Sequence, residues 1–136
     1  MNPSINHICH TDDDPDDHLI FSTVLKEIFP EATLFPFYNC GELLQFLKEE
    51  NTELPEIIFI DQNMPGNRGN ECLQEIKQMA RTCNIPVVLY STSGEPKTID
   101  KAIGLGAYKY IIKPSTFGET KVVISEILST LSLGYK

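Results

Sequence analysis

Five short segments rich in apolar and β-forming residues recur along the chain at intervals of roughly 25 residues, and this repetition limits the fold more than any other feature. They are residues 5–11, 32–38, 56–60, 86–90 and 108–112. Apolar residues at helical spacing lie between and after them: Leu19, Ile20, Val24 and Ile28; Leu43, Leu44, Phe46 and Leu47; Leu73, Ile76 and Met79; Ile99, Ile103 and Leu105; Val123, Ile124, Ile127, Leu128 and Leu131. Alternating strands and helices predict right-handed crossovers and an α/β fold, a doubly wound five-stranded parallel sheet with helices on both faces.

Two segments indicate the order of the strands. The third, "EIIFI", is apolar enough to lie at the centre of a sheet. The second, "ATLFPFY", contains Pro36, which has no N–H group for a neighbouring strand and therefore favours an edge position. The expected order is 2-1-3-4-5, the flavodoxin-like arrangement, in which the first and third strands are neighbours.

The size and charge of the chain bound its function. With 136 residues it suits one domain, and we expect residues 1–136 to form that domain without an output domain. The formal net charge is −8, and five of the 19 acidic residues lie between positions 12 and 17. A nucleic-acid backbone would be repelled by such a chain, so we expect no direct nucleic-acid binding.

The sequence shows no run of apolar residues long enough to cross a bilayer and no signal-peptide pattern at its start. We therefore expect a soluble cytoplasmic protein that does not bind membranes. The four cysteines, Cys9, Cys40, Cys72 and Cys83, are scattered and show no CxxC pairing, so we interpret them as reduced thiols.

The first predicted strand, "INHICHT", is unusually polar for a central position. We expect at least one of His7 and His10 to be partly buried and hydrogen-bonded. A transition-metal site that uses one of these histidines is the alternative, and a hydrogen-bonded structural histidine is the simpler interpretation.

Polar side chains follow four of the five predicted strands. Asp12 and Asp13 come after the first strand, Asp61 after the third, Ser91 after the fourth and Lys113 after the fifth. Because the carboxyl ends of parallel strands share one edge, these side chains should meet where the strand order reverses, which is where open α/β sheets bind ligands.

That set of side chains indicates a particular chemistry. Three carboxylates at one place repel one another unless a cation is present, and oxygen ligands without thiolate or imidazole favour Mg²⁺ over Mn²⁺ or Ca²⁺. Mg²⁺ is commonly completed by phosphate oxygens, and Lys113 adds a positive charge for another oxygen. One carboxylate can then act as a nucleophile that forms an acyl phosphate.

The motifs "TDDDP", "FIDQNMPG", "VVLYSTS" and "YIIKPS" occur in this order at predicted strand ends, and together they resemble the receiver domain of two-component response regulators over nearly the whole chain. The resemblance implies that Asp61 accepts a phosphoryl group from a sensor histidine kinase or a phosphotransfer protein. It also implies roles for six other positions. Asp13 would bind Mg²⁺ directly and Asp12 mainly through water, together with Asp61 and the backbone carbonyl of Asn63. Ser91 and Lys113 would contact the phosphoryl group, and Ser91 and Tyr110 would act as the switch.

The resemblance has further implications. Phosphorylation would change the surface formed by the fourth helix, fifth strand and fifth helix, where a downstream effector or a second copy would bind. The peptide bond between Lys113 and Pro114 is similar to the family's cis peptide. "AIGLGA" departs from the family pattern at Gly104, so the fourth helix is expected either to be short or mobile or simply to tolerate a poor helix former.

Three alternatives remain open. A pseudo-receiver would keep the fold as a protein-interaction module without phosphorylation, but this chain retains the acidic, hydroxyl and lysine positions. A phosphatase with an aspartyl nucleophile would need a general acid two residues after Asp61, where "DQN" has Asn63. A flavodoxin-like flavin carrier would place its phosphate against an acidic edge. We therefore expect a signalling domain that dephosphorylates itself and is otherwise not an enzyme.

The stretch "HTDDDPDD" divides into two functions by position. Asp12 and Asp13 belong to the cation site. Asp14 precedes Pro15, the pair that favours a helix N-cap followed by its first residue. Asp16 and Asp17 then lie in the first turn, where the helix dipole favours negative charge.

Overall fold

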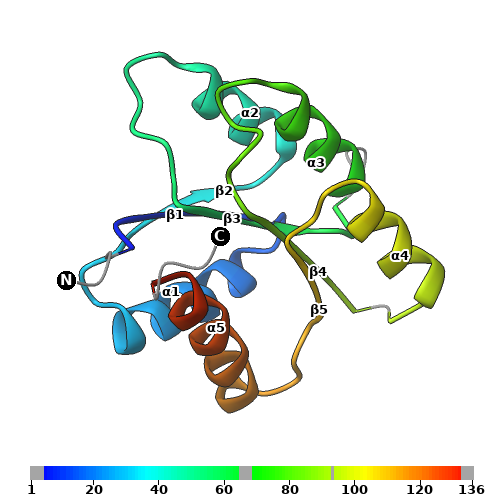
Figure 1. Ribbon diagram of the computed structural model, residues 1–136. Helices are drawn as coiled ribbons and strands as arrows, with labels where there is room; N and C mark the ends of the chain where they lie inside the picture. Colours follow the sequence, from blue (N-terminus) through cyan, green and yellow to red (C-terminus); the bar gives the residue numbers. More distant parts are fainter. Residues whose placement is uncertain (1–4, 65–68, 93, 133–136) are drawn as a thin grey trace.

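A computed structural model describes residues 5–64, 69–92 and 94–132, and within them strands and helices alternate as the sequence predicts (Figure 1). The strands are β1 (His7–Thr11), β2 (Thr33–Phe37), β3 (Ile57–Asp61), β4 (Val87–Ser91) and β5 (Lys109–Ile112). The helices are α1 (Pro15–Ile28), α2 (Cys40–Lys48), α3 (Gly69–Gln78), α4 (Pro96–Gly104) and α5 (Phe117–Ser132).

The sheet is parallel, and its order is β2-β1-β3-β4-β5, which confirms the predicted arrangement. β2 is an edge strand, and its Pro36 lies opposite His10 of β1. β3 is buried along its whole length at the centre of the sheet. β1 and β3 are neighbours, so the strand order reverses between the end of β1 and the end of β3.

Helices cover both faces of this sheet (Figure 1). α1 and α5 lie on one face, and α2, α3 and α4 lie on the other. Side chains of each strand point alternately to the two faces, so Ile58 and Ile60 join the core under α2 and α3, whereas Ile57 and Phe59 join the core under α1 and α5. The two faces therefore have separate apolar cores.

The predicted apolar stripe of α1 is wrong at its start. Leu19 is 67% exposed and Ile20 is 40% exposed, whereas Val24 is buried as predicted. His18 and Phe21 take the buried positions instead. His18 can lie on the buried face because its ring is hydrogen-bonded to main-chain carbonyl groups. A search for apolar residues at helical spacing cannot predict a buried polar residue of this kind.

The other helices bury most of the predicted residues. The buried members are Leu43, Leu44 and Leu47 of α2, Leu73 and Ile76 of α3, and Ile124, Ile127 and Leu128 of α5. α4 is the exception, because Ala102 is its buried residue and Ile103 is 48% exposed. α4 has nine residues and ends at Gly104, in agreement with a short fourth helix.

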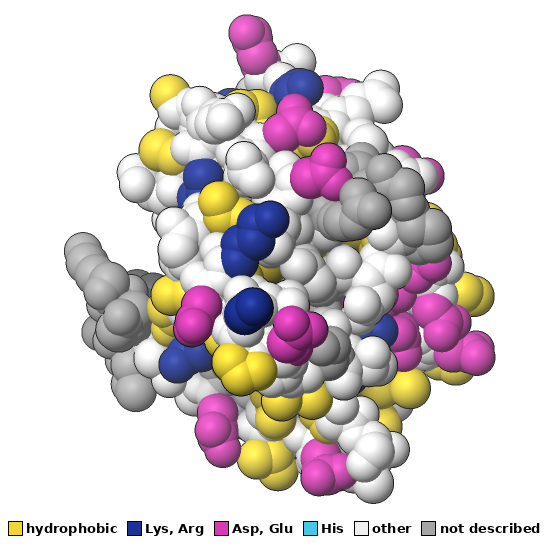
Figure 2. Space-filling model, turned by 90° about the vertical axis from the view of Figure 1, so that its right-hand side faces the viewer, with side chains coloured by type: hydrophobic (Ala, Val, Ile, Leu, Met, Phe, Trp, Pro, Cys, Tyr) yellow, Lys and Arg dark blue, Asp and Glu magenta, His cyan; other side chains and the backbone are white. Residues whose placement is uncertain are grey.

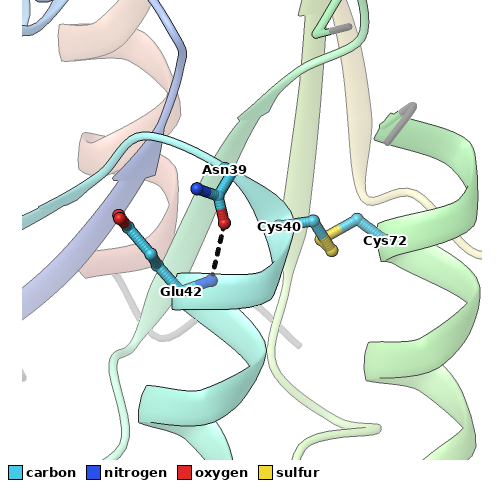
Figure 3. The surroundings of a disulfide bond; sticks show 4 residues. All are labelled: Asn39, Cys40, Glu42 and Cys72. Carbon is cyan, nitrogen blue, oxygen red and sulfur yellow. Dashed lines mark hydrogen bonds between the residues drawn. A yellow bond between two sulfur atoms is a disulfide. The ribbon is translucent and has the colours of Figure 1, made fainter. Parts of the chain in front are cut away.

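Two of the four cysteines form a disulfide, which corrects the prediction that all are reduced. Cys40 in the first turn of α2 is bonded to Cys72 of α3, with their Cα atoms 5.9 Å apart (Figure 3). Cys9 and Cys83 are free thiols as predicted. The pair is 32 residues apart in sequence and meets only because α2 and α3 pack side by side on one face of the sheet. Beside it, Asn39 caps α2 by accepting the N–H of Glu42 at 2.9 Å (Figure 3).

Candidate functional site

The carboxyl ends of the strands bring the predicted acidic residues together. Asp12 directly follows β1, and Asp61 is the last residue of the neighbouring β3. One carboxylate oxygen from each of Asp12, Asp13 and Asp61 lies within 4.8 Å of the others. Asp12 and Asp61 are buried, and Asp13 is exposed. The site thus has one open side, as a site for a visiting phosphoryl group requires.

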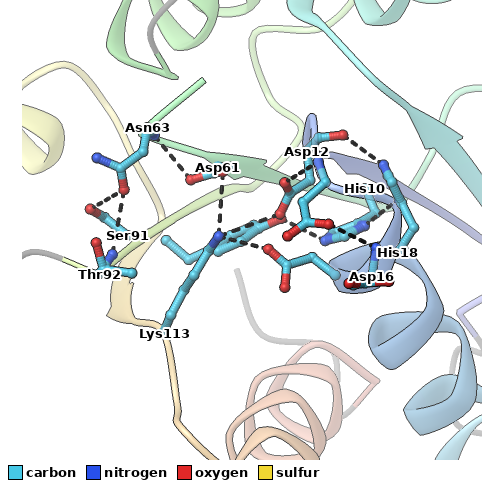
Figure 4. A network of polar contacts seen from close by, with 12 residues as sticks. His10, Asp12, Asp16, His18, Asp61, Asn63, Ser91, Thr92 and Lys113 are labelled. Atoms are coloured by element: carbon cyan, nitrogen blue, oxygen red, sulfur yellow. Dashed lines mark hydrogen bonds and ion pairs between the residues drawn. The ribbon is translucent and has the colours of Figure 1, made fainter. Parts of the chain in front are cut away.

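Lys113, just after β5, points into this acidic cluster (Figure 4). Its Nζ lies 2.8 Å from Asp17 Oδ2, 3.4 Å from Asp61 Oδ2 and 3.6 Å from Asp12 Oδ2. Burial by itself lowers the pKa of Lys113, but the hydrogen bond to Asp17 and the charges of Asp12 and Asp61 outweigh it and hold the pKa above its usual value. Lys113 therefore stays positively charged and partly neutralises the carboxylates.

Asp17 is a site residue that the sequence assignment missed. It lies in the first turn of α1 as predicted, but its carboxylate also makes the shortest contact of Lys113. Burial opposes ionisation of Asp17, while the hydrogen bond from Lys113 favours it, and the net result is a lowered pKa. The first turn of α1 starts at the same edge of the sheet as the site. This position in the sequence could have indicated that Asp17 lies near Lys113.

Asp61, the candidate phosphoacceptor, is oriented by a hydrogen bond from the loop that directly follows it. Asp61 Oδ1 accepts the backbone N–H of Asn63 at 2.9 Å (Figure 4). α3 begins close behind, because Gly69 lies so near Gln62 that a Cβ atom would be 2.9 Å from the Gln62 Cα. A glycine at this position allows α3 to start directly against the end of β3.

Ser91 and Tyr110 are the two residues that the resemblance assigns to a switch, and their surroundings are described by the structure. Ser91 Oγ donates to Asn63 Oδ1 at 2.7 Å, and Thr92 N–H donates to the same oxygen at 3.4 Å (Figure 4). Tyr110 on β5 is half-buried and packs against the core under α2, α3 and α4. In this state the Ser91 hydroxyl is thus engaged with Asn63, and its contact with a phosphoryl oxygen stays a prediction.

The peptide bond between Lys113 and Pro114 is trans, so the expectation of a cis bond is wrong. Lys113 N–H donates to the Ser91 carbonyl oxygen at 2.7 Å, which continues the pairing of β4 and β5 up to this bond. Bonds before proline favour the trans form unless a tertiary contact selects the cis form.

Asp12 is hydrogen-bonded through both carboxylate oxygens. Asp14 N–H donates to Oδ1 at 2.9 Å, and the Tyr90 hydroxyl donates to Oδ2 at 2.7 Å. Burial raises the pKa of Asp12 to about 7, the two hydrogen bonds oppose this rise, and the negative charge of Asp61 adds to it. A neighbouring cation would favour the ionised form of Asp12.

Two buried histidines lie behind Asp12, and sequence analysis identified one of them. His10 is buried and hydrogen-bonded, as expected for a histidine of the first strand. Its Nδ1 lies 2.8 Å from His18 Nδ1, and its Nε2 lies 2.6 Å from the Tyr90 hydroxyl oxygen. Burial, followed by the nearby His18 and Lys113, holds the pKa of His10 well below its usual value, so the ring is neutral. These hydrogen bonds support the structural interpretation of His10.

The assembled groups suit phosphate chemistry. Carboxylate oxygens provide ligands for a hard divalent cation, and Lys113 provides a fixed positive charge. The site contains a buried carboxylate, Asp61, with both features beside it.

A family comparison then decides the assignment. Residues 11–125 match the model of the response regulator receiver domain. The chain belongs to this family. The acidic pocket of Asp12, Asp13 and Asp61 fits the phosphoacceptor site of such receiver domains, which act in two-component signalling.

Individual relatives agree with the family assignment. The receiver is 30% identical over 120 residues to the two-component response regulator ARR11 of Arabidopsis thaliana, covering 86% of this chain and 21% of that protein. It is 34% identical over 74 residues to the probable methanogenesis regulatory protein FilR2 of Methanothrix harundinacea, covering 54% of this chain and 48% of that protein. The chain thus spans from about a fifth to about a half of the length of these two relatives.

A solved structure extends the likeness to three dimensions. The Mn²⁺-bound form of response regulator Rcp1 has a TM-score of 0.84 and 25% sequence identity to this receiver, covering 96% of this chain and 97% of that one. Among the residues that the structure describes, no helix combines the length and apolar character needed to cross a membrane.

Proposed function

We propose that this receiver is phosphorylated on Asp61 and relays a signal through the change that follows. The observation that carries the proposal is the position of Lys113, whose Nζ lies 3.4 Å from Asp61 Oδ2 and also contacts the carboxylates of Asp12 and Asp17. The phosphoryl donor would be a phosphohistidine on a sensor histidine kinase or a phosphotransfer protein. Such kinases work with ATP inside the cell, so we place this receiver in the cytoplasm.

Mg²⁺ is the cofactor that the donor set fits best. Asp12, Asp13 and Asp61 provide carboxylate oxygens from two adjacent strand ends, and we add the backbone carbonyl of Asn63 as a fourth ligand. Oxygen ligands without imidazole or thiolate favour Mg²⁺, and the Mn²⁺ in the similar structure of Rcp1 supports a divalent cation. When bound, Mg²⁺ would neutralise charge on the phosphoryl oxygens.

The chemical step is a transfer between two nucleophiles. An Asp61 carboxylate oxygen forms a bond to phosphorus while the bond between phosphorus and the donor's imidazole nitrogen breaks, and that nitrogen keeps the electron pair. Lys113 stabilises negative charge on the phosphoryl oxygens, and Ser91 donates a hydrogen bond to one of them. Attack by water later returns Asp61 to a free carboxylate, so the domain dephosphorylates itself but does not turn over phosphomonoesters.

The output would be a changed surface. We propose that Ser91 leaves Asn63 for the phosphoryl group and that Tyr110 turns inward, which alters the face formed by α4, β5 and α5. Figure 2 shows the side of the molecule on the right of Figure 1, where hydrophobic side chains lie among lysine, arginine and acidic side chains. Ile103, Ile112 and Val122 are exposed on these three elements. A downstream effector protein is the proposed partner, and a second copy of the chain is the alternative.

Labelling by acetyl phosphate tests the assignment. The purified protein should gain one phosphoryl group, seen by mass spectrometry, in the presence of Mg²⁺ and none after chelation. Asp61→Asn should abolish the gain. Asp100→Asn, at an exposed position on α4, is the matched control and should label normally. Unchanged labelling of Asp61→Asn would overturn the nucleophile, and a folded protein without any labelling would favour an interaction module.

A further inference from the structure

We propose that Tyr90 is a positioning residue that holds Asp12 in place for binding the cation. The proposal rests on the phosphoacceptor function above and adds a residue on β4 to the site. Tyr90 directly precedes Ser91, so the two side chains leave β4 on opposite faces of the sheet. Tyr90 belongs to the core under α1 and α5, the face on which His10 and Phe21 also lie.

Tyr90 reaches its partners across a strand. It pairs in register with Asp61 of β3, and β3 separates β4 from β1. The Tyr90 ring stacks with the ring of His10 on β1, with centroids 5.6 Å apart and planes 7° from parallel. The phenol is buried, and burial and the nearby Asp12 hold its pKa well above the usual value, so it stays a neutral hydrogen-bond donor.

The hydrogen bonds of Tyr90 form a closed loop that begins and ends at Asp12. The hydroxyl lies 2.7 Å from Asp12 Oδ2 and 2.6 Å from His10 Nε2, and His10 Nδ1 lies 2.8 Å from His18 Nδ1. His18 Nε2 then lies 2.8 Å from the main-chain oxygen of Asp12. This oxygen can only accept, so His18 Nε2 carries a hydrogen. Side chain and main chain of Asp12 are thus fixed by the same set of residues (Figure 4).

The loop has a direct consequence for the cation. Asp12 Oδ1 is fixed independently by the N–H of Asp14, so the carboxylate is oriented before any ligand arrives. A ligand that is already oriented loses little freedom on binding, and hydrogen bonds to a metal-binding carboxylate typically contribute about 10- to 100-fold in affinity. We infer that the Tyr90 hydroxyl raises the affinity for Mg²⁺ through Asp12, without touching the ion.

Tyr90→Phe removes the hydroxyl and keeps the ring. Titration calorimetry with Mg²⁺ should show a dissociation constant about tenfold higher than that of the unaltered protein. The carboxyl ¹³C resonance of Asp12 should also shift in the absence of Mg²⁺, because its hydrogen bond is lost. Tyr38→Phe, at a ring that is 44% exposed beside His18, is the matched control and should leave both quantities unchanged.

Val88→Ala separates positioning from stability. Val88 lies on the same strand and face as Tyr90 and is fully buried. This variant should lower the denaturant concentration at the midpoint of unfolding and leave Mg²⁺ affinity unchanged. Tyr90→Phe should weaken Mg²⁺ binding, whatever its own effect on that midpoint. Mg²⁺ affinity that follows stability in both variants, or that is normal in Tyr90→Phe, would overturn the proposal.

Breaking the loop beyond Tyr90 tests its second half. His10→Phe leaves the contact between Tyr90 and Asp12 but removes the group that orients the hydroxyl. Mg²⁺ affinity should fall less than in Tyr90→Phe, and normal affinity would overturn the role of the loop. If the proposed function itself were wrong, the unaltered protein would neither bind Mg²⁺ nor accept a phosphoryl group. That outcome differs from a wrong role for Tyr90, in which the unaltered protein does both.

Discussion

On the face of the sheet covered by α2, α3 and α4, apolar side chains form the core, and the disulfide between Cys40 and Cys72 joins two of the helices. On the face covered by α1 and α5, the apolar core gives way near the site to a hydrogen-bonded set of Asp12, Tyr90 and two histidines. Both faces are equally buried along β3, so burial does not distinguish them. They differ in the interactions that hold each face together near the carboxyl ends of the strands.

The difference teaches how one small domain separates stability from function. Apolar burial and a covalent bond hold their elements without selecting a single direction for a polar group. Hydrogen bonds are weaker on balance but directional, so they suit the face on which Asp12 and Asp61 must keep a fixed geometry. Changes to the apolar core or the disulfide of the first face should therefore alter stability, and changes to the hydrogen-bonded set on the second face should alter cation binding.

Reduction of the disulfide should have the largest effect on stability. Its two cysteines are 32 residues apart, and the chain-entropy relation for a closed loop of that length gives roughly 3 to 4 kcal/mol. Urea unfolding of the oxidised and fully reduced protein measures this difference, and Cys83→Ala should show the same difference. Mg²⁺ affinity should not change on reduction. A large loss of affinity would show that the two faces are coupled.

The pH dependence of stability should report on Asp12. Its pKa is raised to about 7 in the fold, chiefly by burial and further by Asp61, above the usual value near 3.8. The folded state therefore holds this proton more tightly, and the stabilisation is complete below about pH 4 and is lost as pH rises through 7. Without Mg²⁺, the unfolding free energy should therefore fall between about pH 4 and pH 7 because of this group. Asp12→Asn should remove this slope in urea titrations at several pH values.

Two neighbouring aspartates just before α1, Asp13 and Asp14, should affect different properties, one cation binding and the other stability. Asp14 Oδ1 accepts the N–H of Asp16 at 2.9 Å as the N-cap, so Asp14→Ala should cost about 1 kcal/mol of unfolding free energy and largely spare Mg²⁺ affinity. Asp13→Ala should abolish Mg²⁺ binding at little cost in stability, or with a gain, because repulsion falls. Calorimetry and urea unfolding of both variants measure the two effects. Identical behaviour would contradict the division of this acidic stretch.

The smallest effect is expected at the end of α4. Apart from its two chain neighbours and the backbone of its own helix, no described atom lies within 4 Å of the place that a Cβ atom would take at Gly104. Gly104→Ala should therefore raise the unfolding free energy by about 0.4 to 1 kcal/mol. Gly106 is the matched control, because its φ of 106° is unfavourable for alanine and Gly106→Ala should destabilise. Thermal or urea unfolding compares them. A loss of stability in Gly104→Ala would mean that α4 needs this glycine.

Much of the fold and site could be predicted because the signals are local. Strand periodicity, Pro36 on the edge strand and polar residues directly after strands together placed Asp12, Asp61 and Lys113 at one edge of the sheet. The N-cap at Asp14 was equally local. The errors arose where polar residues are buried or where residues distant in sequence meet, as with His18 on α1 and the disulfide of Cys40.

The sequence by itself determined the order of the elements, the topology of the sheet and the chemical character of its carboxyl edge, because these depend on periodicity and on which residue ends each strand. Only the tertiary structure decided that Asp17 pairs with Lys113 and that Tyr90 reaches Asp12 across β3. These contacts join side chains from strands or helices that are neither adjacent in sequence nor paired in the sheet. Their existence depends on the direction and length of each side chain, which spacing along the chain does not encode.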